Sequence, residues 1–284
     1  MLSYSQAFYH LSGRLQQLYE QQEAIAISHE VLFHITKLDK VQRLLGKDTL
    51  FTADQQVQYD HMLQQLENGR PLQYVVGEAW FMGRLFKVDE NVLIPRPETE
   101  ELVQWIIDDT EERTACTILD IGTGSGCIPI SLKLAMPFAG ITSCDISAEA
   151  LGVAHTNMSA LHVDVQFLHL DFLNQKERGA LPMFDVIISN PPYIPISEKE
   201  SLHKNVRDYE PAQALFVPDN DALIFYRVIA EFGKEHLNTN GAIYCELHVD
   251  YAMHTKALFE MAGYSTVEIR KDVHGNLRML KAAR

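Results

Sequence analysis

From residue 117 onward, short apolar runs alternate with longer amphipathic segments, and this alternation constrains the fold more than any other feature. Strands separated by helices pair in parallel, since the chain has to cross back before the next strand begins. Two final strands, at 266–270 and 277–281, have no helix between them and should pair antiparallel. We therefore expect an α/β fold whose mostly parallel sheet has helices on both faces. The other predicted strands are 117–121, 140–146, 165–170, 184–189 and 242–247, and the predicted helices are 127–136, 148–161, 223–237 and 251–262.

Residues 1–97 follow a different pattern. Apolar side chains recur at helical spacing through residues 1–72, which predicts a small helical bundle, and Thr52 should cap its last helix. Residues 73–77 and 85–89 predict the two strands of a β-hairpin, with its loop at 80–83. The expected parts are a helical domain at 1–72, a β-hairpin linker at 73–97 and an α/β domain at 98–284.

Composition excludes several classes of protein. No apolar run approaches the ~18 residues of a membrane span, and residues 1–15 do not resemble a signal peptide, so a cytoplasmic protein without a membrane partner is expected. A net charge of −14 argues against broad binding to nucleic acid, which relies on Lys and Arg. The four cysteines form no Cys-x-x-Cys pair, so we expect buried thiols rather than disulfides or a metal site.

The strand at 117–121 leads into a glycine-rich turn and then a helix. Glycines allow positive φ and a close approach of the backbone to a ligand at the helix N-terminus. Such turns are shared by dinucleotide and S-adenosylmethionine sites, but the Gly-x-Gly-x-x-Gly spacing of the former is not met, because Cys127 occupies its last place. The candidate cofactor-binding residues of the turn are Gly122, Thr123, Gly124, Ser125 and Gly126.

Acidic residues follow the next two strands. Asp145 can accept hydrogen bonds from both hydroxyls of a ribose, the alternative being an N-cap of the helix that follows Ser147. Asp171 and Phe172 can hold the amino edge and the face of an adenine. With the glycine-rich turn, these strand ends describe a nucleoside site, and their order favours an S-adenosylmethionine-dependent methyltransferase over NAD chemistry.

The strand at 184–189 leads into Asn190, Pro191, Pro192 and Tyr193. The prolines stiffen the loop and donate no N–H. The side-chain oxygen of Asn190 and the carbonyl of Pro191 are two acceptors that suit a planar NH2 group. The loop therefore predicts transfer to a planar nitrogen, the alternative being a proline turn that only ends a strand.

Together these motifs resemble the release-factor glutamine N5-methyltransferases (HemK/PrmC type). The most specific match is the Ile-Pro-Arg-Pro-Glu-Thr-Glu run at 94–100 beside the Asn-Pro-Pro-Tyr run at 190–193. The chain departs from the family pattern at 246–251 and 271–278, outside both runs. Further matching stretches are 70–74, 77–78, 86–88, 119–127, 145–147 and 210–211.

The resemblance implies a Rossmann-like, seven-stranded methyltransferase sheet with its last strand antiparallel, a helical substrate-docking domain and a bridging β-hairpin. It implies methyl transfer from S-adenosylmethionine, leaving S-adenosylhomocysteine, to the side-chain amide nitrogen of the glutamine in the Gly-Gly-Gln loop of peptide-chain release factors. Those factors would be the partner, with no stably bound nucleic acid, and a monomer is the default oligomeric state.

The resemblance also implies roles for single residues. Asn190, Pro191 and Tyr193 would be catalytic, with Tyr193 packed on the planar face of the acceptor or near the sulfonium, and Asn190 would also contact the cofactor. Pro192 and Arg96 would join them in binding the substrate. Two alternatives remain open: a nucleic-acid adenine or cytosine N-methyltransferase, and a scaffold protein that does not catalyse. The acidic charge and the lack of a target-recognition insertion count against the first.

Overall fold

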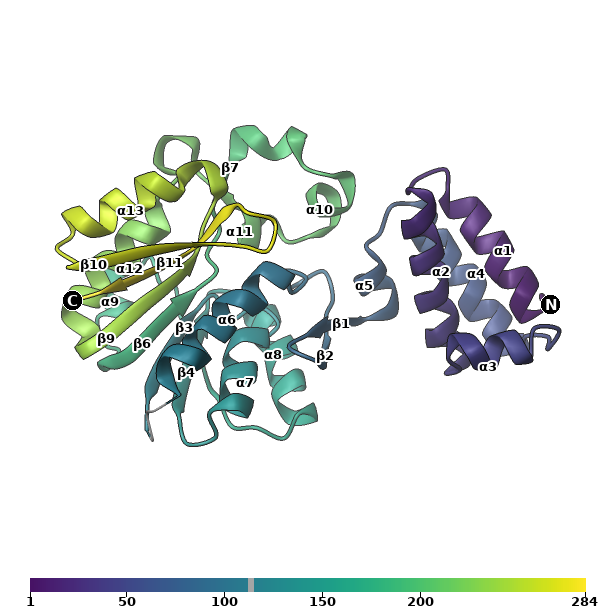
Figure 1. Cartoon of the computed structure of the whole chain (residues 1–284), viewed down its shortest axis with the longest axis horizontal. Helices are drawn as coiled ribbons and strands as arrows, with labels where there is room; N and C mark the ends of the chain where they lie inside the picture. Colours follow the sequence, from purple (N-terminus) through teal and green to yellow (C-terminus); the bar gives the residue numbers. More distant parts are fainter. Residues whose placement is uncertain (112–114) are drawn as a thin grey trace. The chain divides into compact units, whose positions relative to one another are not determined.

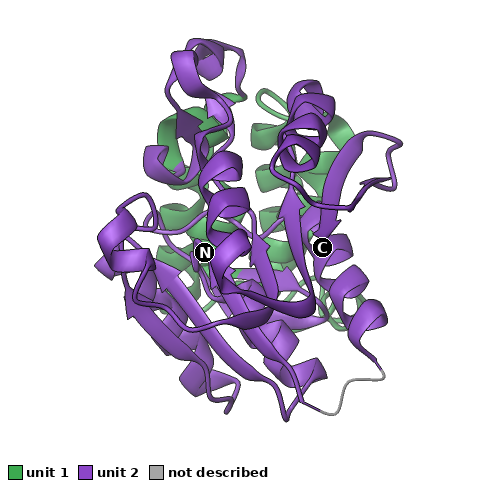
Figure 2. Ribbon diagram, turned by 90° about the vertical axis from the view of Figure 1, so that its left-hand side faces the viewer, with its two compact units in different colours: residues 1–78, 203–209 green, residues 79–202, 210–284 purple. Residues whose placement is uncertain are grey.

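The computed structural model describes residues 1–111 and 115–284, and the chain divides into two compact units. Unit 1 comprises residues 1–78 together with 203–209, and unit 2 comprises 79–202 and 210–284 (Figure 2). Unit 1 therefore contains a short segment, 203–209, that lies far from residues 1–78 in the sequence and between two stretches of unit 2.

Unit 1 is a helical bundle, as the sequence predicts. Thr52 caps α4 as expected: its hydroxyl accepts from the backbone of Gln55 at 3.2 Å, and the Gln55 side chain accepts from the backbone of Thr52 at 3.0 Å. Such a reciprocal pair satisfies two amide groups that the helix leaves unbonded. The helices are α1 (Tyr4–Leu15), α2 (Gln21–Thr36), α3 (Lys40–Leu45), α4 (Ala53–Glu67) and α5 (Leu72–Val76).

The inserted segment of unit 1 contains α10 (Lys204–Tyr209). The amide of Asn205 donates to the hydroxyl of Tyr19 at 3.2 Å, and the hydroxyl of Tyr209 donates to the carbonyl of Asn68 at 2.9 Å. These bonds attach the segment to the bundle.

The predicted strand at 73–77 is wrong, because these residues form most of α5. Pro71 stands at the N-cap, and its carbonyl accepts from the backbone of both Tyr74 and Val75 at 3.1 Å. Gly77, at φ +73°, ends the helix in the left-handed conformation that glycine adopts readily. A β-branched run this short does not distinguish strand from helix, and here the flanking Pro and Gly favour one helical turn.

A β-hairpin does follow, displaced from the predicted positions. Its strands are β1 (Glu78–Phe81) and β2 (Arg84–Lys87), so that the turn is only Met82 and Gly83, both at positive φ. Phe81 and Phe86 are buried in a core cluster of unit 2. The side chain of Asn157 accepts from the backbone of Lys87 at 2.6 Å and donates to its carbonyl at 2.9 Å, which fixes β2 to α8.

The described residues of unit 2 form the seven-stranded sheet, in the order β10-β11-β9-β6-β3-β4-β5. Every pair between β9 and β5 is parallel, and β11 runs antiparallel to both of its neighbours, which confirms the predicted fold class. The strands are β3 (Thr117–Ile121), β4 (Gly140–Asp145), β5 (Gln166–His169), β6 (Phe184–Ser189), β9 (Leu237–Glu246), β10 (Thr266–Lys271) and β11 (Leu277–Ala283).

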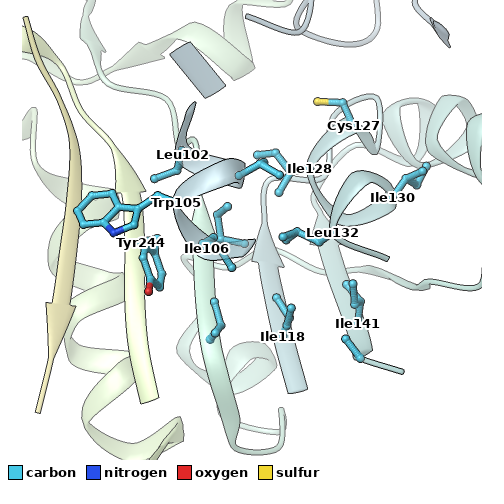
Figure 3. Packing of buried hydrophobic residues seen from close by; sticks show 14 of the residues in the cluster. Leu102, Trp105, Ile106, Ile118, Cys127, Ile128, Ile130, Leu132, Ile141 and Tyr244 are labelled. Atoms are coloured by element: carbon cyan, nitrogen blue, oxygen red, sulfur yellow. The ribbon is translucent and has the colours of Figure 1, made fainter. Parts of the chain in front are cut away.

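Helices cover both faces of this sheet (Figure 1). Side chains alternate along each strand, so that Ile118 packs into one core cluster and Leu119 into the other. Figure 3 shows the first cluster, in which Trp105 lies near Tyr244 with their ring centroids 5.6 Å apart. The helices are α6 (Pro97–Thr110), α7 (Cys127–Ala135), α8 (Ala148–Ala160), α9 (Gln175–Arg178), α11 (Ala212–Leu215), α12 (Ile224–His236) and α13 (Ala252–Met261), and a small pair of strands, β7 (Ile194–Pro195) and β8 (Phe216–Val217), lies outside the main sheet.

Candidate functional site

A cavity of about 410 Å³ lies in unit 2 at the carboxyl ends of β3, β4 and β6. The strand order reverses beside β3, since β4 follows on one side and β6 on the other, and open α/β sheets bind ligands at such a point. Residues 91–96 and 211–218 supply much of the remaining wall. Of the residues predicted from the sequence, the cavity is lined by Arg96, Gly122, Thr123, Gly124, Ser125, Asp145, Asp171, Phe172, Asn190, Pro191 and Pro192.

The glycine-rich turn has the backbone that its sequence predicts. Gly124 is at φ +51°, and its N–H donates to the Asp145 carboxylate at 2.9 Å. Gly126 does not line the cavity; it caps α7 at φ +79°, and a Cβ there would lie 2.9 Å from Ile130 and 3.1 Å from Ala154. Gly126 therefore permits the close packing of α7 and α8 behind the turn.

The Asp145 carboxylate connects the glycine-rich turn to the end of β4 through hydrogen bonds. Besides the Gly124 N–H, it accepts the N–H of Ser147 at 2.9 Å through its other oxygen. The alternative role of Asp145 as an N-cap is wrong, because Ser147 caps α8 by accepting from Ala150 at 3.0 Å. A carboxylate has about four acceptor positions, so two remain for a ligand in the cavity.

Asp171 and Phe172 lie beyond the end of β5. Asp171 accepts the N–H of Leu173 at 2.9 Å, and its own N–H donates to Glu177 at 2.9 Å, so local bonds fix its backbone. Phe172 is buried and packs edge-on against Phe232, with ring centroids 5.1 Å apart. Both residues line the cavity.

A hydrogen-bonded network lies behind Asn190. Its side-chain NH2 donates to the hydroxyl of Thr99 at 3.1 Å, and Thr99 donates to Glu246 at 2.6 Å. Tyr193 does not line the cavity; its hydroxyl donates to the other carboxylate oxygen of Glu246 at 3.2 Å, and burial raises the pKa of this phenol. None of the residues that the structure describes donates to the side-chain oxygen of Asn190 or to the carbonyl of Pro191.

Arg96 reaches the cavity wall, but its guanidinium forms an ion pair with the buried carboxylate of Glu210. The second oxygen of that carboxylate accepts the backbone N–H of Ile94 at 3.2 Å. Residues 94–96 and 210–211 are thus held together across one side of the cavity. Sequence reasoning expected Arg96 at the substrate and did not identify its partner.

All four cysteines are buried, as expected from the sequence. Cys127 and Cys144 line the cavity, where burial raises the pKa of both thiols, that of Cys127 to about 12. Thiols of this kind are poor nucleophiles at neutral pH. Within residues 1–111 and 115–284, no cluster of His, Cys, Asp or Glu could hold a metal ion, and no helix is long and apolar enough to cross a membrane.

Sequence reasoning missed Thr99 and Glu246. Thr99 lines the cavity, and Glu246 is 2% exposed. Thr99 accepts a hydrogen bond from Asn190 and donates one to Glu246. Thr99 belongs to the Arg-Pro-Glu-Thr-Glu run, and this is the sequence feature that could have identified it as a functional residue. Glu246 is the last residue of β9. A carboxylate in an otherwise apolar strand indicates a buried hydrogen-bonding partner, because an unpaired buried charge is costly.

Comparison with family models divides the chain at a similar place. The model described as "PrmC N-terminal domain" matches residues 6–77, and "Methyltransferase small domain" matches residues 99–208. Among solved structures, the fold is similar to the hMettl16 catalytic domain in complex with MAT2A 3′UTR hairpin 6, with a TM-score of 0.56, 16% identity, and coverage of 89% of this chain and 92% of that one. At this identity the similarity concerns the fold alone.

Two curated relatives match over nearly the whole chain. The release factor glutamine methyltransferase of Flavobacterium psychrophilum is 40% identical over 94% of this chain and 94% of its own length. The protein with the same description from Bacteroides thetaiotaomicron is 41% identical, over 95% of this chain and 96% of its own length. The similarity therefore spans both the helical bundle and the α/β unit.

Proposed function

The chain belongs to the family of release factor glutamine methyltransferases, and from this premise we propose that it methylates the side-chain amide nitrogen (N5) of the glutamine in the Gly-Gly-Gln loop of peptide-chain release factors. Membership of the family makes the chain an S-adenosylmethionine-dependent methyltransferase. The proposal concerns the acceptor, the residues that hold it and those that hold the cofactor.

The cavity fits S-adenosylmethionine in size and in donor set. Its volume of about 410 Å³ is within the range of ~300–1,000 Å³ found for small-molecule sites. The backbone of Gly122 to Ser125 would lie along the cofactor, the two remaining acceptor positions of Asp145 would take the ribose hydroxyls, and Asp171 with Phe172 would hold the adenine. When bound, the cofactor supplies an electrophilic methyl group on a sulfonium.

The observation that carries the proposal is the pair of acceptors at the start of the Asn-Pro-Pro-Tyr loop. Asn190 uses its NH2 on Thr99, which leaves its oxygen without a donor from the described residues, and the Pro191 carbonyl is likewise without one. Two such oxygens match the two N–H bonds of a primary amide. A glutamine side chain would satisfy both at once.

An amide nitrogen is a poor nucleophile because its lone pair is delocalised. Asn190 and Pro191 would orient the nitrogen, and orientation of this kind can supply about 7–11 kcal/mol of the barrier. As positive charge develops on the nitrogen, the same two oxygens would stabilise it. The stiff prolines keep both acceptors in place before the substrate arrives.

Tyr193 and Arg96 keep weaker roles in this proposal. Tyr193 would act through Glu246, because its hydroxyl is bonded to that carboxylate. Arg96 would shape the entrance with Glu210 rather than bind the acceptor by itself. We further propose that the helical unit, which the PrmC N-terminal domain model matches, docks the release factor, and that the enzyme works as a monomer in the cytoplasm.

Mass spectrometry of a release factor incubated with the enzyme and S-adenosylmethionine tests the proposal. The peptide that carries Gly-Gly-Gln should gain one methylene, and a release factor with Glu in place of that Gln, which has no amide nitrogen, should gain none. A parallel incubation with RNA and DNA tests the alternative acceptor. Methylation of nucleic acid with no change in the release factor would overturn the proposal.

A further inference from the structure

The network behind Asn190 has a fixed direction of hydrogen bonding. It starts at Glu246, which is 2% exposed at the end of β9, and passes through Thr99, which is 3% exposed on the first turn of α6. The two oxygens of Glu246 accept from the hydroxyls of Thr99 and Tyr193, at 2.6 and 3.2 Å. Neither Thr99 nor Glu246 belongs to the loop that is proposed to contact the substrate.

The carboxylate determines how Thr99 can bond. An ionised carboxylate only accepts, and a hydroxyl has a single hydrogen to donate. Thr99 donates that hydrogen to Glu246, so its oxygen can only accept from Asn190. Asn190 must then turn its NH2 toward Thr99 and its oxygen the other way.

This matters because the two ends of an asparagine amide are nearly the same size and differ only in hydrogen bonding. Packing alone therefore does not decide which end faces the cavity. With the amide reversed, the NH2 of Asn190 would face the NH2 of the substrate, and two donors cannot bond to each other.

We infer that Thr99 and Glu246 are positioning residues for methyl transfer: Glu246 sets the direction of the hydrogen bond from Thr99, and Thr99 thereby holds the oxygen of Asn190 toward the acceptor nitrogen. The inference rests on the proposed function, in which Asn190 accepts from the substrate amide. Both residues act through Asn190, which holds the acceptor in the proposed function.

The protonation state of Glu246 should make the rate of methyl transfer depend on pH. Burial raises the pKa of Glu246, and Glu98 on α6 acts in the same direction, whereas Arg278 on β11 and the hydroxyls of Thr99 and Tyr193 oppose the rise. Tyr226 on α12 faces the same residue and donates to its backbone carbonyl at 2.9 Å. A protonated Glu246 can donate to Thr99, which then can donate to Asn190 and reverse the amide. The rate should therefore fall as the pH drops through the raised pKa.

The test compares Thr99→Val with Thr99→Ser and with Thr110→Val, a matched control. Thr110 is a buried threonine at the other end of α6 whose hydroxyl donates to the carbonyl of Ile106 in its own helix. We measure kcat and KM for release-factor methylation, and cofactor affinity by calorimetry. Thr99→Val should lower kcat about 10-fold or more, with KM and cofactor affinity unchanged. A tenfold loss corresponds to roughly 1.4 kcal/mol, which is the size of a typical hydrogen-bond contribution. Thr99→Ser should recover most of the loss, and Thr110→Val should stay near the wild type.

The wild-type pH profile provides a second measurement that needs no variant, in case Thr99→Val does not fold. At saturating cofactor and release factor, kcat should decline on the acid side, and Glu246→Gln, whose amide does not titrate, should lack that decline. If Thr99→Val keeps the wild-type kcat, or if the wild-type kcat does not depend on pH down to acid unfolding, the inference is wrong while the proposed function stands. If the wild-type chain does not methylate the release factor, the proposed function fails, and the inference fails with it.

Discussion

Replacing Asn190 by Ala removes one of the two acceptors proposed for the substrate amide and little else. The only hydrogen bond of this side chain within the described residues is the one to Thr99 at 3.1 Å, and the residue is half-buried. Loss of one neutral hydrogen bond costs about 1 kcal/mol of stability, which lowers the Tm of a domain this size by roughly 2–4 °C. Stability should therefore change little.

The effect on catalysis should be much larger. Removing one preorganised group that stabilises developing charge costs about 2.7–4 kcal/mol in the transition state, or roughly 10²–10³ in kcat. Cofactor affinity should stay close to the wild type, because the glycine-rich turn, Asp145, Asp171 and Phe172 are unchanged. The assay is the rate of methyl incorporation into a release factor at saturating cofactor, with calorimetry for the cofactor.

Asn238→Ala is the matched control. Asn238 is also half-buried and donates one side-chain hydrogen bond, to Asp185 at 3.0 Å, at the opposite end of the sheet from the cavity. It should lose similar stability and keep its rate. A kcat for Asn190→Ala within about twofold of the control would refute the role assigned to Asn190.

Three further predictions concern the cofactor side of the cavity and the core behind it. Gly126→Ala should lower the free energy of unfolding by about 1–3 kcal/mol in urea titrations, because a Cβ at φ +79° would lie 3.1 Å from Ala154. Asp145→Asn should weaken S-adenosylmethionine binding about 10–100-fold by calorimetry, since charge-assisted hydrogen bonds contribute about 1.5–3 kcal/mol; an unchanged affinity would contradict the ribose assignment. Burial raises the pKa of Asp120 to about 8, against about 3.9 in the unfolded chain. The native state therefore binds a proton that the unfolded state lacks, and stability should fall as the pH rises between these two values. Relative to Asp120→Asn, the wild type should lose about 3 kcal/mol between pH 6 and pH 9 in urea unfolding, and parallel curves would contradict this.

Much of the candidate site follows from where strands end. In a parallel sheet the carboxyl ends of all strands lie at one edge, so the residues after β3, β4 and β6 come together whatever the details of packing. That rule is enough to bring Gly124, Asp145 and Asn190 to one cavity. The positive φ of the turn is equally local, because it needs only glycine at those positions.

Other features could not be read from local pattern. Residues 203–209 fold with the bundle through Tyr19 and Asn68, contacts that no periodicity in the segment itself encodes. Residues 73–77 form a helix against their β-branched composition, since Pro71 and Gly77 bound a stretch too short for periodicity to decide.

By itself, the sequence determined the succession of the seven main-sheet strands along the chain, the α/β class and most of the residues that meet at the sheet edge, because side-chain periodicity and glycine conformations are local properties. Only the tertiary structure decided which way the Asn190 amide faces. That depends on a threonine from α6 and a glutamate from β9, distant in the chain, and the direction of a hydrogen bond exists only once its donor and acceptor are in contact. For the same reason, the hydrogen bond of the Tyr193 hydroxyl to Glu246 could not be read from the sequence.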